Sequence, residues 1–178
     1  RQYVRRQIDE YLVFLETVCG KKCDHDHLKD VGRLSMEGQR LWQAVLDTTM
    51  NKPAPMSAFD AFFHLALIVT LRGTQTVVDY YTGLLEEMKT RVAEGISAVP
   101  EERYRLLWDN LPIWFKTRWM SDKFAAHKAC LVADTYTSAW CGSLPYLNEE
   151  NFLESMAEGY SRIYLNIGTD RMAEMVVE

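Results

Sequence analysis

The sequence predicts an α/β protein in which a helical part precedes a small parallel sheet. Two short apolar runs, Arg103–Trp108 and Ala129–Ala133, flank an amphipathic stretch and have the pattern of a strand, helix and strand unit. Strands joined through a helix are most simply parallel, as in a Rossmann-like fold. We therefore expect an antiparallel helical subdomain over residues 1–96 and part of a Rossmann-like parallel α/β subdomain over residues 97–178.

The first two helices are predicted from apolar spacing and from the residues at their ends. Residues 4–18 carry apolar side chains at helical spacing, and Gly20 suits the position that ends such a helix. Asp24 or Asp26 can cap the second helix through its side-chain oxygen. The proline-containing segment NKPAP, residues 51–55, must end it.

Two further helices complete the predicted helical subdomain. Ser57 and Asp60 have the spacing of a capping box, which predicts a single third helix that runs to about Leu71 and is closed by Arg72 and Gly73. The fourth helix is expected to begin at Thr74, with an apolar face along its length, and to end at Gly95.

The strand, helix and strand unit has distinct signals at each junction. Its first strand is rich in aromatic and aliphatic residues, so we expect it to be buried and to end in a turn at Asp109 and Asn110. Pro112 occupies a position where a helix can begin, because its missing N–H costs nothing there. The helix is expected to start at that proline.

The C-terminal part is predicted to contain a loop and two helices. The loop CGSLPYLN precedes a helix from about Glu149 to Leu165, Gly168 breaks that helix, and Thr169 can cap the last one. The chain also begins inside an amphipathic pattern and without an initiator methionine, from which we expect it to be a segment of a longer polypeptide.

Composition argues against several classes of partner. The net charge of −5, with no basic block, disfavours nucleic acid and anionic membranes as partners. No apolar run is long enough to span a bilayer, and the N-terminal residues lack the apolar core of a signal peptide. A cytoplasmic location is therefore expected. Neither G-x-G-x-x-G nor a Walker motif occurs, so no phosphate-binding glycine loop is predicted.

The predicted topology indicates where a ligand would bind. In open parallel sheets, ligands lie beyond the carboxyl ends of the strands. The segments Asp109–Trp114 and Asp134–Trp140 follow the two predicted strands, so we expect them to share one edge. The alternative, that both are ordinary connections beside an aromatic core, remains open.

The four cysteines do not predict a metal site. Cys19 and Cys23 stand in VCGKKCDHDH with two histidines close behind, but the spacing is not that of a zinc finger and the aspartates serve as helix caps. Cys130 lies in an apolar strand and is expected to be a buried thiol. Cys141 lies at the predicted ligand edge, where a functional role stays open. We assign no metal ligand.

Five stretches, read together, resemble a known family. In chain order they are ETVCGKKCDHDHL, NKPAPMSAFDAFFHLALIVTLRGT, RVAEG, RYRLLWDNLPIWF and ACLVADTYTSAW. They resemble the central part of a 2-hydroxyacyl-CoA dehydratase subunit, from the superfamily that also contains the ATP-dependent benzoyl-CoA reductases. The resemblance extends over nearly the whole chain and keeps the order of the parts.

The resemblance implies a cofactor, partners and a reaction. By this resemblance, the full subunit has two Rossmann-like domains with a [4Fe-4S] cluster between them. The cluster cysteines of the family lie outside a segment like this one. The resemblance further implies a second dehydratase subunit in a heterodimer, an ATP-hydrolysing activator that delivers one electron, and an acyl-CoA substrate; a flavin in the complex stays open. The implied reaction removes water from a 2-hydroxyacyl-CoA through a ketyl radical and gives an enoyl-CoA. The isolated segment is expected to be inactive.

The resemblance also indicates a substrate site. Asn110, Leu111, Pro112 and Trp114 match the family stretch G-(I/L)-P-x-W, with asparagine in place of the usual glycine. We expect this loop to line the thioester or CoA pocket together with three residues that follow the second strand, Tyr136, Thr137 and Trp140. The tryptophans would exclude water, and the two hydroxyls would donate to the carbonyl or to the leaving hydroxyl. Two alternatives stay open: an aryl-CoA reductase subunit, and a non-catalytic scaffold for subunit contact.

Overall fold

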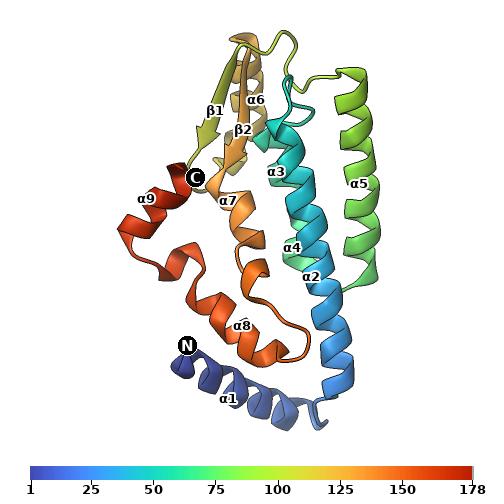
Figure 1. Ribbon diagram of the computed structural model, residues 1–178, viewed down its shortest axis with the longest axis vertical. Coiled ribbons are helices and arrows are strands. Elements are labelled where there is room, and N and C mark those ends of the chain that lie inside the picture. Colours follow the sequence, from blue (N-terminus) through green and yellow to red (C-terminus); the bar gives the residue numbers. More distant parts are fainter. Residues whose placement is uncertain (178) are drawn as a thin grey trace.

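The computed structural model describes residues 1–177 and shows a mostly helical molecule with a small parallel sheet at one end (Figure 1). Residues before the sheet are helical, as predicted, so the α/β class is confirmed. Short 3-10 turns join several of the regular elements. In chain order these elements are α1 (Gln2–Cys19), α2 (His25–Asp47), α3 (Ala58–His64), α4 (Ala66–Thr70), α5 (Gln75–Glu94), β1 (Tyr104–Trp108), α6 (Thr117–Ala126), β2 (Ala129–Asp134), α7 (Thr135–Ser138), α8 (Phe152–Ser161) and α9 (Thr169–Val177).

Helices α2 and α5 lie side by side along the molecule (Figure 1). The cap of α2 is Asp24, whose Oδ1 accepts hydrogen bonds from the backbone N–H groups of Asp26 and His27. Helix α5 ends at Gly95 in the left-handed conformation. Between the two helices, the rings of Trp42 and Tyr81 are fully buried with centroids 5.0 Å apart. The predicted cap of α2 and the predicted end of α5 are therefore confirmed.

The third predicted helix is capped as expected but is divided in two. Ser57 and Asp60 form the capping box at the start of α3. The helix is interrupted at Leu65, because the hydroxyl of Tyr81 donates to the carbonyl of His64 at 2.9 Å and accepts from the N–H of Ile68 at 3.1 Å. These two backbone groups would bond to each other in an unbroken helix. The prediction of one continuous helix to Leu71 is wrong for this reason.

Strands β1 and β2 pair in parallel, as predicted, with Tyr104 opposite Ala129 and Trp108 opposite Asp134. The prediction that β1 is buried is wrong: Tyr104 is 50% exposed and Leu107 is 46% exposed. Helices α3 and α6 contact β2, and within residues 1–177 no further strand pairs with the outer edge of β1. The buried strand is therefore β2, which these two helices cover.

The crossover helix begins later than predicted. Pro112 is followed by Ile113 with φ −82° and ψ 82°, which is not helical, and by a 3-10 turn over Trp114–Lys116. Helix α6 then begins at Thr117, whose hydroxyl donates to the carbonyl of Trp114 at 2.9 Å. The proline fixes the loop, and it is not the first residue of the helix.

The main apolar cluster contains residues from both predicted subdomains. Trp42 and Tyr81 from the helices pack with Cys141 from the segment after β2. The indole N–H of Trp42 also donates to the carbonyl of Thr137 at 3.1 Å, across 95 positions of sequence. The long helices and the loop beyond the sheet therefore share one core.

Helix α8 returns to the helical part of the molecule and is shorter than predicted. It covers Phe152–Ser161, and a 3-10 turn at Tyr164–Asn166 takes the place of the predicted last turn. The Phe152 ring packs against Gly32 of α2, where a Cβ atom would lie 2.8 Å from the ring carbons. Glycine inside α2 allows this close approach.

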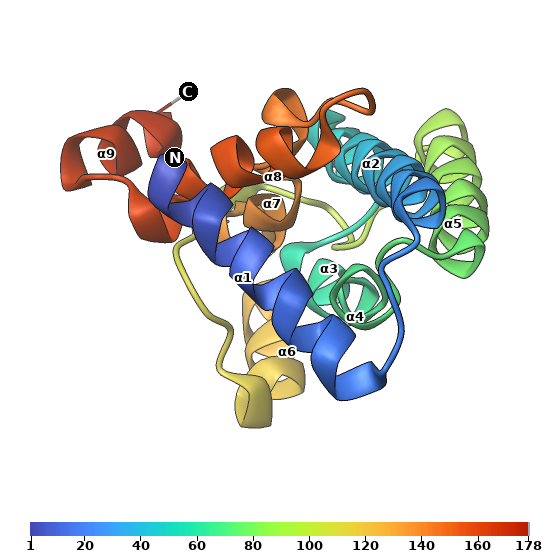
Figure 2. The ribbon, with the colours of Figure 1, turned by 90° about the horizontal axis from the view of Figure 1, so that it is seen from below.

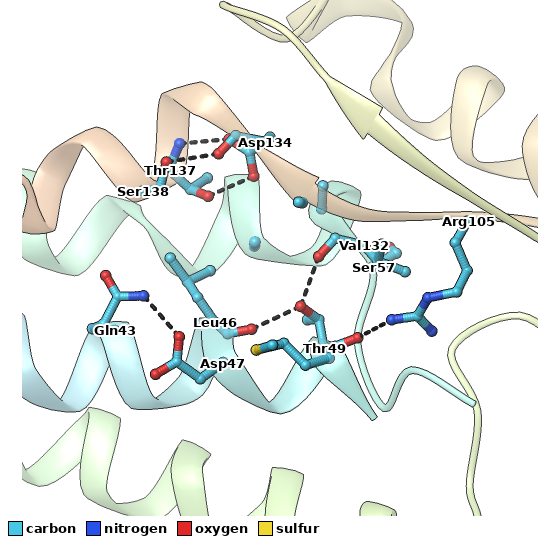
Figure 3. Close-up of a pocket in the computed structure, with 14 residues that line it drawn as sticks. Gln43, Leu46, Asp47, Thr49, Ser57, Arg105, Val132, Asp134, Thr137 and Ser138 are labelled. Carbon is cyan, nitrogen blue, oxygen red and sulfur yellow. Dashed lines mark hydrogen bonds between the residues drawn. The ribbon is translucent and has the colours of Figure 1, made fainter. Parts of the chain in front are cut away.

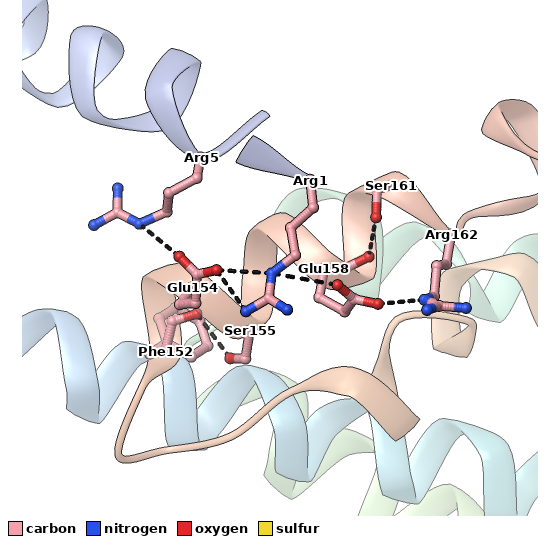
Figure 4. A network of polar contacts seen from close by, with 8 residues as sticks. All are labelled: Arg1, Arg5, Phe152, Glu154, Ser155, Glu158, Ser161 and Arg162. Atoms are coloured by element: carbon pink, nitrogen blue, oxygen red, sulfur yellow. Dashed lines mark hydrogen bonds and ion pairs between the residues drawn. The ribbon is translucent and has the colours of Figure 1, made fainter. Parts of the chain in front are cut away.

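Helix α1 packs against α8 through charged side chains (Figures 2 and 4). Arg1 contacts Glu154 at 2.5 Å and Glu158 at 3.4 Å, and Arg5 contacts Glu154 at 3.5 Å. Glu158 also pairs with Arg162 of the residues that follow α8. No residue of α1 is buried. Among the helices of residues 1–177, none is both long and apolar enough to cross a bilayer.

Candidate functional site

The loops that follow the two strands meet at one edge of the sheet. The N–H of Asn110 donates to Oγ1 of Thr135 at 2.8 Å, and this hydroxyl donates to Oδ1 of Asp109 at 2.9 Å. Asn110 has φ 69°, a left-handed conformation that asparagine tolerates better than most residues. Asparagine thus suits this position, and the predicted shared edge is confirmed.

Aromatic rings continue from this edge into the molecule. Trp114 is 50% exposed, and its ring centroid lies 6.1 Å from Phe62 and 6.3 Å from Tyr136. Pro112 is buried, whereas Leu111 is exposed and its carbonyl accepts from the indole N–H of Trp108 at 3.2 Å. The loop therefore presents Leu111 and Trp114 outward, with Tyr136 directly behind.

Behind Tyr136 lies a cavity of about 370 Å³ between the loop after β2, helix α2 and helix α8. Tyr136 and Trp140 contribute aromatic walls, and the half-exposed Tyr160 is a third aromatic residue in the lining. Its volume lies within the usual range for small-molecule sites, roughly 300–1,000 Å³. The full lining is Ser35, Gln39, Arg72, Tyr136, Ala139, Trp140, Ser143, Leu147, Phe152, Met156, Tyr160, Ile163, Tyr164 and Leu165.

Arg72 is the cationic side chain in this lining. Its Nη2 donates to the carbonyl of Trp140 at 2.9 Å, and its guanidinium carbon lies 5.9 Å from the centroid of the Trp140 ring. Burial lowers the pKa of the Arg72 guanidinium from its ordinary value. The arginine thus orients Trp140 and brings a positive charge to an apolar wall.

Thr137 belongs to a different environment from Tyr136 and Trp140. It is 1% exposed, and its backbone N–H and its hydroxyl each donate to the Asp134 carboxylate at 2.5 Å (Figure 3). Asp134 thereby caps α7, and Thr137 is not among the residues that line the 370 Å³ cavity. Its hydroxyl has a partner inside the protein, so we place Thr137 among the residues that support the site.

Asp134 and Thr137 line a second cavity of about 240 Å³ (Figure 3). The other polar groups around it pair with one another: Oγ1 of Thr49 donates to the carbonyl of Val132 at 2.6 Å, and Nη2 of Arg105 donates to the carbonyl of Thr49 at 2.5 Å. Arg105 also pairs with Glu102 at 2.6 Å. This cavity lies between the end of α2 and the two strands.

Replacing Asp134 with alanine is expected to lower the free energy of unfolding by about 1–2 kcal/mol, because Thr137 loses the acceptor that caps α7. Asparagine keeps one acceptor oxygen, so Asp134→Asn should cost less. Chemical denaturation of the three proteins at neutral pH measures both differences. Equal losses in the two variants would contradict the capping role.

The pH dependence of this residue has a definite sign. Burial raises the pKa of Asp134 above its ordinary value of 3.8, despite the hydrogen bonds from Thr137. The protonated carboxyl therefore favours the folded state below pH 3.8, and this contribution is lost as the pH rises through the raised pKa. The stability of the wild type relative to Asp134→Asn should fall over that interval. A difference that is constant with pH would contradict the prediction.

Cys130 and Cys141 lie in two different apolar clusters. Cys130 is buried, as predicted, and burial raises its pKa to about 12. Cys141 is buried too, its Sγ lies 3.3 Å from the carbonyl of Gln39, and burial raises its pKa to about 12. Both stay protonated thiols at neutral pH. Within residues 1–177, no three His, Cys, Asp or Glu side chains meet in a group that could hold a metal ion.

The sequence prediction included Tyr136 and Trp140 and missed the side chains on the opposite walls. Arg72 comes from the turn between α4 and α5, Gln39 from α2 and Tyr160 from α8. The sequence pattern assigns Arg72 and Gly73 only to a helix end. An arginine that directly follows an apolar helix is the one signal that could have indicated a partly buried cation.

Comparison with known proteins gives a consistent result. The family model for 2-hydroxyglutaryl-CoA dehydratase, D-component, matches residues 1–178. The chain is 31% identical over 178 residues to the (R)-2-hydroxyisocaproyl-CoA dehydratase alpha subunit of Clostridioides difficile, a match that covers 99% of this chain and 43% of the relative.

Two other relatives carry different names. Over 116 residues the chain is 32% identical to (R)-2-hydroxyglutaryl-CoA dehydratase, subunit alpha, of Acidaminococcus fermentans, covering 65% of this chain and 24% of the relative. Over 146 residues it is 31% identical to a subunit of the benzoyl-CoA reductase of Thauera aromatica, covering 77% and 34%. The chain thus spans less than half the length of these curated relatives.

Proposed function

This chain belongs to the family of the 2-hydroxyglutaryl-CoA dehydratase D-component, and from that premise we propose that it forms part of the acyl-CoA site of a dehydratase subunit. The proposed reaction is the elimination of water from a 2-hydroxyacyl-CoA to give an enoyl-CoA. The relatives are named as alpha subunits of dehydratases, so we also propose a partner subunit, an activator protein and an acyl-CoA as the molecules with which the whole protein works.

The proposed location of the site rests on the position of Tyr136. The ring of Tyr136 lies 6.3 Å from Trp114 of the loop after β1, and the same residue lines the 370 Å³ cavity with Trp140. The exposed loop and the cavity are therefore neighbours at the carboxyl edge of the sheet, where ligands of open α/β proteins bind. We place the thioester near Trp114 and Tyr136 and the acyl chain in the cavity.

The described residues can perform three tasks in this proposal. Leu111 and Trp114 cover the thioester side and exclude water, which protects a reactive intermediate. The hydroxyl of Tyr136 is available as a donor to the thioester carbonyl or to the leaving hydroxyl. Trp140, held by Arg72, forms the wall that orients the acyl chain.

The iron-sulfur cluster expected from the family does not fit the described cysteines. Cys130 and Cys141 are buried in two different apolar clusters, and no metal-binding group of three or more such side chains forms among residues 1–177. A cluster requires several thiolates directed at one point. We therefore propose no role for this part of the chain in ligating the cluster.

The test is the activity of the complete dehydratase with Trp114→Ala in this subunit. We expect kcat/KM for a 2-hydroxyacyl-CoA to fall by at least about 10-fold, which corresponds to roughly 1.4 kcal/mol of lost stabilisation. Trp119→Ala is the matched control, because Trp119 is also exposed but lies on α6. Equal activities of the two variants would contradict the placement of the thioester.

Tyr136→Phe tests the hydroxyl separately. It keeps the ring that contacts Trp114 and removes only the donor. A lower kcat with an unchanged KM would support donation in the transition state. Unchanged kinetics would restrict Tyr136 to a structural wall.

A further inference from the structure

Arg72 brings a charge into the cavity that no described carboxylate neutralises. The residues that line the cavity include no aspartate and no glutamate. Its hydrogen bond within residues 1–177 goes to the backbone carbonyl of Trp140 at 2.9 Å. A guanidinium has five N–H donors in a planar fork suited to a carboxylate.

Holding the charged guanidinium of Arg72 away from water costs free energy. Burial already lowers the pKa of Arg72, which means that the charged form has lost favourable solvation. A negatively charged group that enters the cavity would compensate the guanidinium for the solvation that it has lost. Two parallel hydrogen bonds from a guanidinium to a carboxylate form one of the stronger ion pairs in proteins. The contact with Trp140 holds the guanidinium in place before any ligand arrives.

The other walls limit what the ligand can be. Phe152, Met156, Ile163 and Trp140 make most of the surface apolar, and the volume is about 370 Å³. This space suits a chain of a few carbon atoms with one polar end. The phosphates of coenzyme A carry several negative charges and would require more cations than Arg72 alone supplies.

We propose that Arg72 is a specificity-determining residue that binds a carboxylate at the far end of the acyl chain. The preferred substrates would then be 2-hydroxyacyl-CoA thioesters of dicarboxylic acids. This inference rests on the proposed function. The relatives are named for both apolar and acidic acyl groups, so family membership leaves this choice open.

The experiment compares two substrates on each enzyme preparation, with this chain in its full-length subunit and complete complex. The substrates are 2-hydroxyglutaryl-CoA, which ends in a carboxylate, and 2-hydroxyisocaproyl-CoA, which ends in methyl groups. We expect the wild type to prefer the first, and Arg72→Met to lower the ratio of the two kcat/KM values by roughly 10- to 150-fold, the value of a hydrogen bond to a charged group. A ratio is insensitive to the fraction of folded enzyme.

Two variants serve as controls. Arg72→Lys keeps the charge without the fork and should lower the ratio less than Arg72→Met. Arg118→Met removes an exposed arginine on α6 and should leave the ratio unchanged. A wild-type preference for 2-hydroxyisocaproyl-CoA, or a ratio that Arg72→Met does not change, would overturn the inference while the dehydratase function stands.

Binding without turnover separates the remaining outcomes. Isothermal titration calorimetry should show that Arg72→Met weakens the binding of glutaryl-CoA and leaves that of isocaproyl-CoA and free coenzyme A unchanged. Weaker binding of coenzyme A alone would assign Arg72 to a phosphate and overturn the inference. If neither hydroxyacyl substrate is dehydrated but glutaryl-CoA binding depends on Arg72, the proposed reaction fails and the carboxylate site stands.

Discussion

Replacing Trp42 with alanine is expected to lower the free energy of unfolding by about 3–5 kcal/mol, the usual cost of removing a large buried aromatic side chain. Trp42 has no exposed surface, its ring packs against Tyr81 at 5.0 Å, and its N–H donates to the carbonyl of Thr137. The substitution leaves a cavity between α2 and α5 and an unpaired carbonyl after β2. Denaturation by urea, followed by circular dichroism, measures the loss.

Two variants identify the cause of this loss. Trp119→Ala makes the same chemical change at a residue that is 57% exposed, so it should alter stability by no more than about 0.5 kcal/mol. Trp42→Phe keeps an aromatic ring and removes the indole N–H, and should fall between alanine and wild type. If Trp42→Ala and Trp119→Ala were equally stable, Trp42 would not be the centre of a shared core.

Gly73→Ala is expected to destabilise the fold by roughly 2–5 kcal/mol. Gly73 has φ 81°, and a left-handed conformation costs another residue roughly 1–2 kcal/mol. An added Cβ would also lie 2.6 Å from Cγ1 of Val31 and 3.2 Å from its carbonyl oxygen, and such overpacking costs roughly 1–3 kcal/mol more. The turn between α4 and α5 would have to move away from α2. The unfolding midpoint in urea reports the change.

The same substitution at Gly83 is the control. This glycine lies inside α5 and is exposed, and a Cβ atom added to it would have no neighbouring atom within 4 Å. Alanine there should stabilise the protein by about 0.5–1 kcal/mol, because it favours the helix. Opposite signs at the two positions are expected. A loss at both would mean that α5 does not have the helical conformation described.

Helix ends were predictable because the groups that make them are neighbours in sequence. The N–H groups that donate hydrogen bonds to the Asp24 side chain lie two and three residues after it, and Ser57 pairs with Asp60 in the same turn. The interruption at Leu65 has a distant cause, since Tyr81 reaches it from the next long helix, 17 residues from His64. A contact of this kind has no local sequence signal.

In the candidate site too, features that depend on neighbouring residues were predictable and features that depend on distant residues were not. The shared edge of the two loops was predictable, because it depends only on two parallel strands and their connection. The aromatic composition of β1 favours burial, but composition does not reveal whether another layer covers a strand. Arg72 was missed because its cavity forms only when α8 returns to α2. Thr137 was assigned to the ligand, whereas the Asp134 carboxylate three residues earlier already binds its hydroxyl.

The attachment of α1 gives the molecule a response to ionic strength. Arg1 and Arg5 meet Glu154 and Glu158 at the surface, and no residue of α1 is buried (Figure 4). Exposed ion pairs contribute only about 0–1 kcal/mol each, and at about 0.1 M salt charges are screened beyond about 10 Å. Concentrated salt should therefore loosen α1 from α8 well before it affects the buried contacts of Trp42. The ion pairs of Arg1 and Arg5 make the attachment of α1 the part of the described structure that responds most to ionic strength.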